Sequence, residues 1–221
     1  MPLLIAVTGS TPGVGKSTLC AALDEALSAA GRRVDHFREE EILTRPAFAR
    51  VAAEFASTKR VTPAALVQAT AAYARTVDDI AVTDALLPYL PSMLAWGHGE
   101  HELAGFVADL GEAVGDTATV VVHLDGDPAT ALPRAIAREE AGWIDWYVRK
   151  LDSYDPDPPV ADTVGAVAHL ERERATTRRL LESGPFPVVH IERADERPSG
   201  EVLALALAGI EAAMDARAAG E

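Results

Sequence analysis

The segment that most constrains how this chain can fold is STPGVGKS, at residues 10–17. It follows a continuous apolar run, Leu3–Val7, and it leads into a helix expected over Lys16–Ala30, where leucine and alanine recur at helical spacing. A strand that is apolar on both faces is typical of a sheet covered by helices on both sides. A glycine-rich turn between such a strand and a helix therefore predicts an α/β fold built on a parallel sheet.

The turn itself has the spacing of a phosphate-binding loop, or P-loop. It fits the pattern G-x-x-x-x-G-K-[ST], except that serine takes the first place and Gly9 stands immediately before it. Glycines let successive backbone N–H groups point inward, and the N-terminus of the following helix adds positive potential. A turn without phosphate is the alternative, but the motif lies directly between a buried-type strand and a helix. The residues expected to bind the β- and γ-phosphates of ATP are Thr11, Pro12, Gly13, Val14, Gly15, Lys16, Ser17 and Thr18.

Three side chains are expected to complete the phosphate site. Lys16 would bridge the terminal phosphates, and the Ser17 hydroxyl would bind Mg²⁺. Asp84 follows the expected strand Ile80–Thr83, and ligands of open α/β sheets bind beyond the carboxyl ends of the strands. We therefore expect Asp84 either to organise Mg²⁺ or to bind the second substrate. The alternative is a polar residue that only closes the strand.

Strands and helices alternate along the rest of the chain. Further strands are expected at Val34–Phe37, Ile80–Thr83, Ala118–Leu124 and Phe186–Ile191. Helices are expected from about Arg45, from Thr62-Pro63, and at Ser92–Trp96, Glu102–Ala113, Ala129–Glu139, Ala161–Glu182 and Val202–Met214. The pattern predicts a three-layer P-loop NTPase fold, with a five-stranded parallel sheet and helices on both faces, in a single domain over residues 1–221.

The charge balance disfavours several kinds of partner. The chain of 221 residues has 34 acidic and 20 basic side chains, a formal net charge of −14. Nucleic acid polymers and anionic membrane surfaces both attract basic faces, so neither is expected as a partner. No apolar run approaches the roughly 20 residues that span a bilayer. Cys20 is the single cysteine, which excludes an intramolecular disulfide and favours the reducing cytoplasm.

The region after the fourth expected strand resembles the lid of P-loop nucleoside and nucleotide kinases, in their thymidylate-kinase and deoxynucleoside-kinase branches. The resemblance is carried by Asp127-Pro128, then Arg134 and Arg138, then two glutamates and the aromatic segment WYVRKL at residues 146–151. It implies an arginine-bearing lid over about residues 134–159. The spacing of the two arginines on one helix would aim both the same way, and the resemblance implies that they stabilise the transferred phosphoryl group. The alternative is that they are solvated and pair with the neighbouring glutamates.

The resemblance extends more weakly over most of the chain. Phe37-Arg38-Glu39 is similar to an acidic motif in which the nucleoside kinases have a general base, which makes Glu39 a candidate base and Glu40 its substitute. The alternative is a solvated acidic run. The thymidylate-kinase pattern has Asp-Arg after the third strand, whereas this chain has Asp84-Ala85, so thymidylate kinase activity itself is not implied. Residues 193–198 follow the last strand, where related kinases place a loop against adenine.

The chemistry of the phosphoryl acceptor stays open at this point. An alcohol needs a base that accepts its proton, whereas a monophosphate needs additional arginines. The sequence offers both Glu39 and a set of arginines, namely Arg38, Arg45, Arg50 and Arg75. Aromatic residues near the expected lid could stack on a ring or only pack the lid, namely Trp143, Trp146 and Tyr147.

Taken together, the residues and the resemblance predict an ATP- and Mg²⁺-dependent kinase for a small molecule, most plausibly a nucleoside or nucleotide. Its catalytic candidates are Lys16, Glu39, Asp84, Arg134 and Arg138. Two alternatives stay open: a nucleotide-binding switch ATPase with a protein partner, and a phosphotransferase for an antibiotic or sugar alcohol. Related kinases are often dimers, so a homodimer is an oligomeric state to test.

A last expectation concerns the long helix near the C-terminus. Its arginines at 172, 174, 178 and 179 alternate with Glu171 and Glu173. This alternation is typical of an exposed face with salt bridges rather than of a binding surface.

Overall fold

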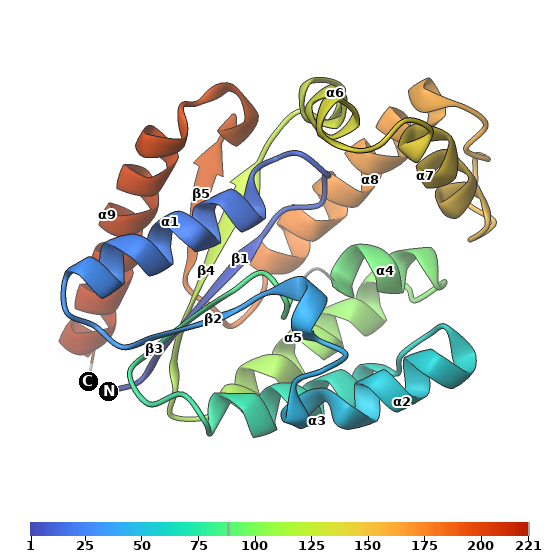
Figure 1. Ribbon diagram of the computed structural model, residues 1–221. Coiled ribbons are helices and arrows are strands. Elements are labelled where there is room, and N and C mark those ends of the chain that lie inside the picture. The colour runs from blue at the N-terminus through green and yellow to red at the C-terminus, as the bar shows by residue number, and fades with distance from the viewer. Residues whose placement is uncertain (88, 221) are drawn as a thin grey trace.

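A parallel sheet forms the centre of the molecule (Figure 1). The computed structural model describes residues 1–87 and 89–220. The strands lie in the order β2-β3-β1-β4-β5, and every neighbouring pair is parallel. Their bounds are β1 Leu3–Thr8, β2 Val34–Phe37, β3 Ile80–Thr83, β4 Ala118–Asp125 and β5 Val188–Glu192. The predicted P-loop fold, with five parallel strands and helices on both faces, is confirmed.

Helices connect the strands. They are α1 Lys16–Ala29, α2 Ala49–Thr58, α3 Pro63–Ala74, α4 Tyr89–Ala95, α5 Glu100–Val114, α6 Pro128–Arg138, α7 Trp143–Asp152, α8 Thr163–Glu182 and α9 Ser199–Gly220. Three single 3₁₀ turns, η1 Glu39–Glu41, η2 Pro46–Phe48 and η3 Ala194–Glu196, complete the connections. Side-chain oxygens cap the N-termini of α3, α6 and α8, because Thr62, Asp127 and Asp162 each accept a hydrogen bond from a backbone N–H of the first turn.

The two faces of the sheet are covered by different helices. On β1, Ile5 packs against α1 and α9, whereas Leu4 points to the opposite face, among residues of α3, α5 and the C-terminal end of α8. Both side chains are fully buried. This alternation is the reason that an unbroken apolar run forms the central strand. The sheet is therefore a rigid support, and its carboxyl edge carries the loops described below.

A third, smaller apolar cluster lies outside the sheet. It joins Leu132 of α6, Tyr147 and Leu151 of α7, and Leu170 of α8. Figure 1 shows α6 and α7 at one end of the molecule, next to the N-terminal part of α8. The helices of the expected lid region are thus held to each other and to α8 by their own core.

Several boundaries differ from the sequence expectation. Helix α9 continues well beyond Met214, and α4 begins at Tyr89 rather than at Ser92. Pro91 lies in the first turn of α4, where backbone N–H groups have no partner within the helix, so it does not interrupt the helix. Pro88, the preceding proline, lies outside the described residues. Among the residues that are described, no helix is long and apolar enough to cross a membrane.

Candidate active site

The phosphate loop leaves β1 at the carboxyl edge of the sheet and turns into α1. Within residues 9–17, positive backbone φ angles occur at Gly13 (84°) and Gly15 (108°). Gly15 is the N-cap residue of α1 and provides no side-chain cap, so the first N–H groups of the helix stay available to an anion. Ser10 has no positive φ. A serine therefore replaces the first glycine of the motif without backbone strain.

Helix α6 supports the loop from behind. A Cβ atom built on Gly13 would lie 2.3 Å from the carbonyl oxygen of Ala131 and 3.0 Å from the backbone nitrogen of Ala135, both on α6. At Gly9, a Cβ atom would lie 2.8 Å from the carbonyl oxygen of Leu124 on β4. These contacts mean that the loop backbone rests directly on the backbone of its neighbours, and only glycine leaves room for that.

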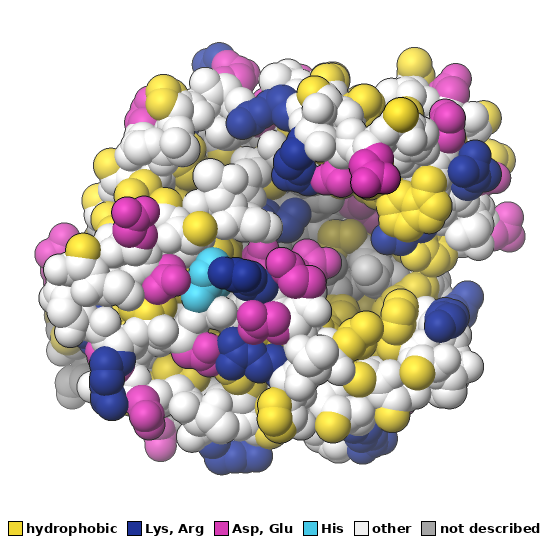
Figure 2. All heavy atoms as spheres, viewed as in Figure 1, with side chains coloured by type: hydrophobic (Ala, Val, Ile, Leu, Met, Phe, Trp, Pro, Cys, Tyr) yellow, Lys and Arg dark blue, Asp and Glu magenta, His cyan; other side chains and the backbone are white. Residues whose placement is uncertain are grey.

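A cavity of about 290 Å³, which we call the loop cavity, lies in front of the loop. Its lining residues are Gly9, Ser10, Pro12, Gly13, Gly15, Lys16, Ser17, Thr18, Glu39, Pro91, Arg138, Tyr147 and Lys150. Of the eight predicted phosphate-binding residues, Thr11 and Val14 do not line it: Thr11 is buried, and Val14 faces a second pocket. Figure 2 shows a hollow on this side of the molecule, with charged side chains on one rim and hydrophobic ones on the other.

Asp84 lies at the base of the site and connects two of its segments. Its Oδ2 accepts a hydrogen bond of 2.9 Å from Ser17 Oγ, and its Oδ1 accepts one of 2.9 Å from the backbone N–H of Glu39. The Thr83 hydroxyl accepts a hydrogen bond from the backbone N–H of Ala85 and thereby shapes this turn. Ala85 is fully buried in the core, so an arginine would not fit at the position where the thymidylate-kinase pattern has one.

The Ser17 and Asp84 side chains have the donor chemistry that Mg²⁺ prefers. A hydroxyl and a carboxylate oxygen lie 2.9 Å apart at the N-terminus of α1. No group of three or more His, Cys, Asp or Glu suited to a metal occurs in the part of the chain that the structure describes. Mg²⁺ is usually bound by one or two protein groups together with substrate phosphates and water.

Lys16 and Glu39 influence each other across the loop cavity. Burial lowers the pKa of Lys16, while the nearby carboxylates of Glu39 and Asp84 act in the opposite direction. Desolvation by the surrounding protein raises the pKa of Glu39, and the Lys16 ammonium opposes that rise. Both Glu39 and Glu40 are exposed, but Glu40, the substitute candidate for the base, does not line the cavity. Of the two glutamates, only Glu39 is therefore placed to meet a ligand there.

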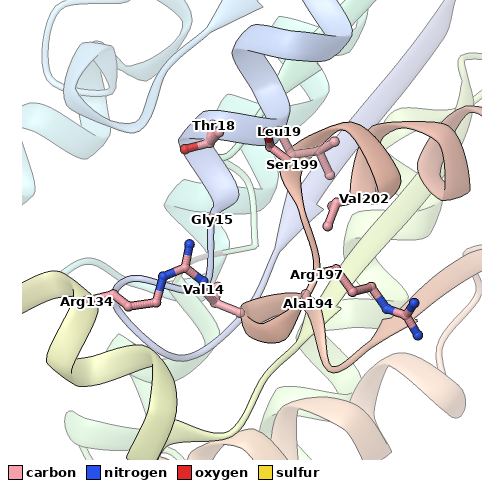
Figure 3. Close-up of a pocket in the computed structure, with 9 residues that line it drawn as sticks. All are labelled: Val14, Gly15, Thr18, Leu19, Arg134, Ala194, Arg197, Ser199 and Val202. Atoms are coloured by element: carbon pink, nitrogen blue, oxygen red, sulfur yellow. The ribbon is translucent and has the colours of Figure 1, made fainter.

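The two arginines of α6 line different spaces, which contradicts the expectation that both face the same way. Arg138 lines the loop cavity and also pairs with Glu139, with Nη2 to Oε1 at 2.6 Å. Arg134 instead donates from Nη1 to the carbonyl oxygen of Asp195 at 2.6 Å and lines the second pocket (Figure 3). A spacing of four residues puts both side chains on the same face of α6, so their divergence comes from the contacts that each side chain makes and not from the helix spacing.

The second pocket, which we call the side pocket, has a volume of about 50 Å³. Its lining residues are Val14, Gly15, Thr18, Leu19, Arg134, Ala194, Arg197, Ser199 and Val202. Gly15 and Thr18 line both spaces, so the side pocket and the loop cavity adjoin at the first turn of α1. Figure 3 shows that η3 and the start of α9 close the side pocket opposite α1.

Helix α7 forms one wall of the loop cavity. The sequence analysis did not identify this wall. Tyr147 and Lys150 line the cavity, and Lys150 Nζ lies 5.4 Å from the centre of the Trp146 ring. Trp143 stacks on Tyr147, with ring centres 4.9 Å apart, so this tryptophan packs within the helix rather than on a ligand. Lys150 received no role from the sequence, because a lysine among charged residues on a helix has no distinguishing pattern.

The expectation for the arginines of α8 is wrong in part. Arg174 and Arg178 reach the fully buried Asp125 at the end of β4, and Arg178 Nη1 lies 2.7 Å from its Oδ2. Next to this cluster, Nδ1 of His123 lies 3.1 Å from Nδ1 of His190, and burial lowers the pKa of His123 to about 4. These two arginines fasten α8 to the sheet instead of forming only a solvated face.

Comparison with known proteins gives a fold but no close relative. No protein-family model matches the chain, and no curated sequence is significantly similar to it. Among solved structures, a deoxyadenosine kinase from M. mycoides with bound dATP has a TM-score of 0.54 at 15% identity, over 96% of this chain and 100% of that one. A gluconokinase from Sinorhizobium meliloti 1021 has a TM-score of 0.50 at 16% identity, over 100% and 98%.

A third similar structure is the YorR protein from Bacillus subtilis in complex with phosphorylated GDP. Its TM-score is 0.51 at 13% identity, and the match covers 95% of each chain. At these identities the likeness concerns the fold, which is that of the P-loop kinases, and it extends over nearly the whole chain. The substrate has to be argued from the site itself.

Proposed function

We propose that this protein is an ATP- and Mg²⁺-dependent kinase that transfers the γ-phosphoryl group to a small molecule. The single observation that supports this most is the loop cavity, which is lined by the phosphate loop together with a carboxylate, Glu39, and an arginine, Arg138. A protein that only binds a nucleotide requires the loop but has no need of the other two groups. The kinase fold of the similar structures agrees with this assignment.

In this proposal, different parts of the site bind different parts of ATP. The backbone N–H groups at the start of α1 and the Lys16 ammonium bind the β- and γ-phosphates. The base would occupy the side pocket, between Arg134 and the η3 segment, where the resemblance places adenine. Ser17 and Asp84 would hold Mg²⁺, which neutralises phosphate charge when bound.

The protein's own groups then position and stabilise the transfer. Arg138 leaves Glu139 as the lid, residues 134–159, closes, and it neutralises charge on the equatorial oxygens of the γ-phosphoryl group. Lys16 remains in contact with the same oxygens. Because no covalent intermediate is needed, catalysis consists of positioning and charge neutralisation.

Acceptor-dependent turnover tests the proposal. We expect the purified protein with ATP and Mg²⁺ to release ADP slowly in buffer and faster when a matching acceptor is added from a panel of nucleosides, nucleotides and sugar alcohols. We also expect Lys16→Ala to abolish both rates while its circular dichroism spectrum stays unchanged. ATP binding without any Lys16-dependent release of ADP would contradict the proposal and would favour the switch alternative.

A further inference from the structure

The charges around the loop cavity differ between its two sides. On the loop side, Lys16 and Arg138 are committed to the phosphates of ATP in the function proposed above. On the opposite side, the ionisable lining residues of the described chain are Glu39, Tyr147 and Lys150. An acceptor that occupies this opposite side therefore meets one carboxylate and one ammonium group, but no guanidinium beyond Arg138.

The arginines that could have bound a phosphate on the acceptor are engaged elsewhere or lie outside the cavity. Arg45 Nη2 pairs with Asp35 and with Glu41, each at 2.8 Å, and its guanidinium lies 4.9 Å from the centre of the Phe37 ring. Arg50 donates to Gln68 at 2.7 Å. Arg38 and Arg75 are exposed, and neither is among the residues that line the cavity.

Two side chains next to the lining residues, Glu173 and Tyr89, carry no positive charge. Glu173 of α8 is buried, its Oε1 lies 3.2 Å from His169 Nε2, and after burial its charge is the largest cause that raises the pKa of Tyr147. On α4, the Tyr89 hydroxyl is buried without a hydrogen-bond partner among the described residues, and it lies within electrostatic reach of Glu39. A phosphate group on the acceptor would therefore have the Lys150 ammonium as its cationic partner among the lining residues of this side, and no guanidinium for bidentate hydrogen bonds.

We propose that the acceptor is an alcohol without a phosphate group, either uncharged or cationic, and that Glu39 receives its proton. This inference rests on the function proposed above and narrows it. The alcohol oxygen bonds to the γ-phosphorus, the bond from that phosphorus to the oxygen bridging to the β-phosphate breaks, and ADP leaves with the bond's electron pair. The alcohol proton passes to the Glu39 carboxylate, so charge and atoms balance without a further reactant.

A panel of matched pairs tests the acceptor class. Each pair is a nucleoside and its 5′-monophosphate, such as thymidine and thymidine 5′-monophosphate, and an aminocyclitol is included as a cationic alcohol. At saturating ATP and Mg²⁺ we expect only members without phosphate to accelerate ADP release, with a product heavier by one phosphoryl group in mass spectrometry. A higher kcat/KM for any monophosphate than for its parent alcohol would overturn the inference while leaving the kinase function intact.

Water provides a test that does not depend on finding the right compound, because it can replace the alcohol in slow ATP hydrolysis. We expect Glu39→Gln to lower that basal rate about 10-fold or more. The neighbouring Glu40→Gln, which changes a carboxylate outside the cavity, should leave it unchanged. Equal hydrolysis by the wild type and Glu39→Gln would overturn the role of Glu39. If the wild type and Lys16→Ala hydrolyse ATP equally, the proposed function itself fails, and this inference fails with it.

Discussion

The phosphate side of the loop cavity is made largely of backbone, whereas the opposite side is made of side chains. Apart from Arg138, the phosphate side comes from one segment, residues 9–18. The acceptor side combines Glu39 after β2, Pro91 on α4, and Tyr147 and Lys150 on α7. A backbone site depends on two glycine conformations and recognises any polyphosphate chain, while a side-chain site can change its ligand by a single substitution.

The difference explains why such a fold supports many substrates. The loop side is held in place by its backbone contacts with β4 and α6. The same loop has to serve every acceptor. The acceptor side is assembled from segments that vary independently, at the carboxyl edge of the sheet where ligands of α/β proteins bind. Substitutions on the two sides should therefore have different signatures in kinetics.

The largest effect is expected on the loop side, from Lys16→Ala. Loss of the ammonium removes a contact to the β- and γ-phosphates, and we expect kcat to fall by at least about 10²-fold with every acceptor. Steady-state kinetics with two acceptors measures this, and the melting temperature should stay close to that of the wild type. A loss confined to one acceptor would mean that the lysine belongs to the acceptor side.

The two arginines of α6 test whether the loop cavity and the side pocket are separate. We expect Arg138→Ala to lower kcat by about 10- to 100-fold with little change in ATP affinity, because this arginine meets the transferred group only during the reaction. Arg134→Ala should instead weaken ATP binding and leave kcat nearly unchanged. Isothermal titration and initial rates separate the two outcomes. Identical profiles for both variants would contradict the separate placement of the two side chains.

A series of glycine variants tests whether the loop is a backbone site. Gly13→Ala combines a positive φ with an overlap on α6, and we expect it to lower the free energy of unfolding by on the order of 2 kcal/mol. Gly15→Ala has the positive φ but open space, so roughly 1 kcal/mol is expected. Gly105→Ala, on α5 with open space, should stabilise by roughly 0.5–1 kcal/mol.

Urea unfolding measures the three values. The rank order is the prediction, with Gly13→Ala least stable and Gly105→Ala most stable. If Gly13→Ala and Gly15→Ala were equally stable, the close contact between the loop and α6 would contribute nothing to the difference in the free energy of unfolding.

The smallest effect is a shift in the pH dependence on the acceptor side. Because the protein raises the pKa of Glu39, the active carboxylate forms only above that raised value, so kcat/KM with an alcohol should fall as pH decreases through it. Lys150 lowers this pKa, since its positive charge favours the carboxylate. We therefore expect Lys150→Met to move the acidic limb of the profile of kcat/KM against pH to higher pH, by less than about one unit.

Arg149→Met is the matched control for that measurement. It removes a positive charge from the adjacent residue of α7, which is exposed and does not line the cavity. The acidic limb of the pH profile of this variant should coincide with that of the wild type. Equal shifts in both variants would indicate a general change of surface charge rather than a contact between Lys150 and the acceptor side.

The sequence predicted the elements that depend on local pattern. The five strands, the phosphate loop and the placement of Asp84 at the carboxyl edge follow from apolar runs, glycine spacing and the parallel connection rule. In the structure, the side chains of Ser17 and Asp84, 67 positions apart in the chain, form a hydrogen bond. This proximity was predictable because neighbouring parallel strands end at the same edge.

Features that depend on tertiary packing could not be predicted in this way. The divergence of Arg134 and Arg138 depends on where the loop lies against α6, which is a contact between distant segments. The pairing of Arg174 and Arg178 with buried Asp125 requires the orientation of α8 on the sheet. In the sequence, both arginine pairs have only the spacing of a solvated helix face.

The direct contact between Gly13 and α6 has a mechanical consequence. Because no side chain lies between the two backbones, any displacement of the loop is transmitted to α6 without a compressible layer. Because α6, α7 and α8 share one apolar cluster, filling the phosphate site would push on α6 and, through that cluster, on the wall of the loop cavity that α7 forms.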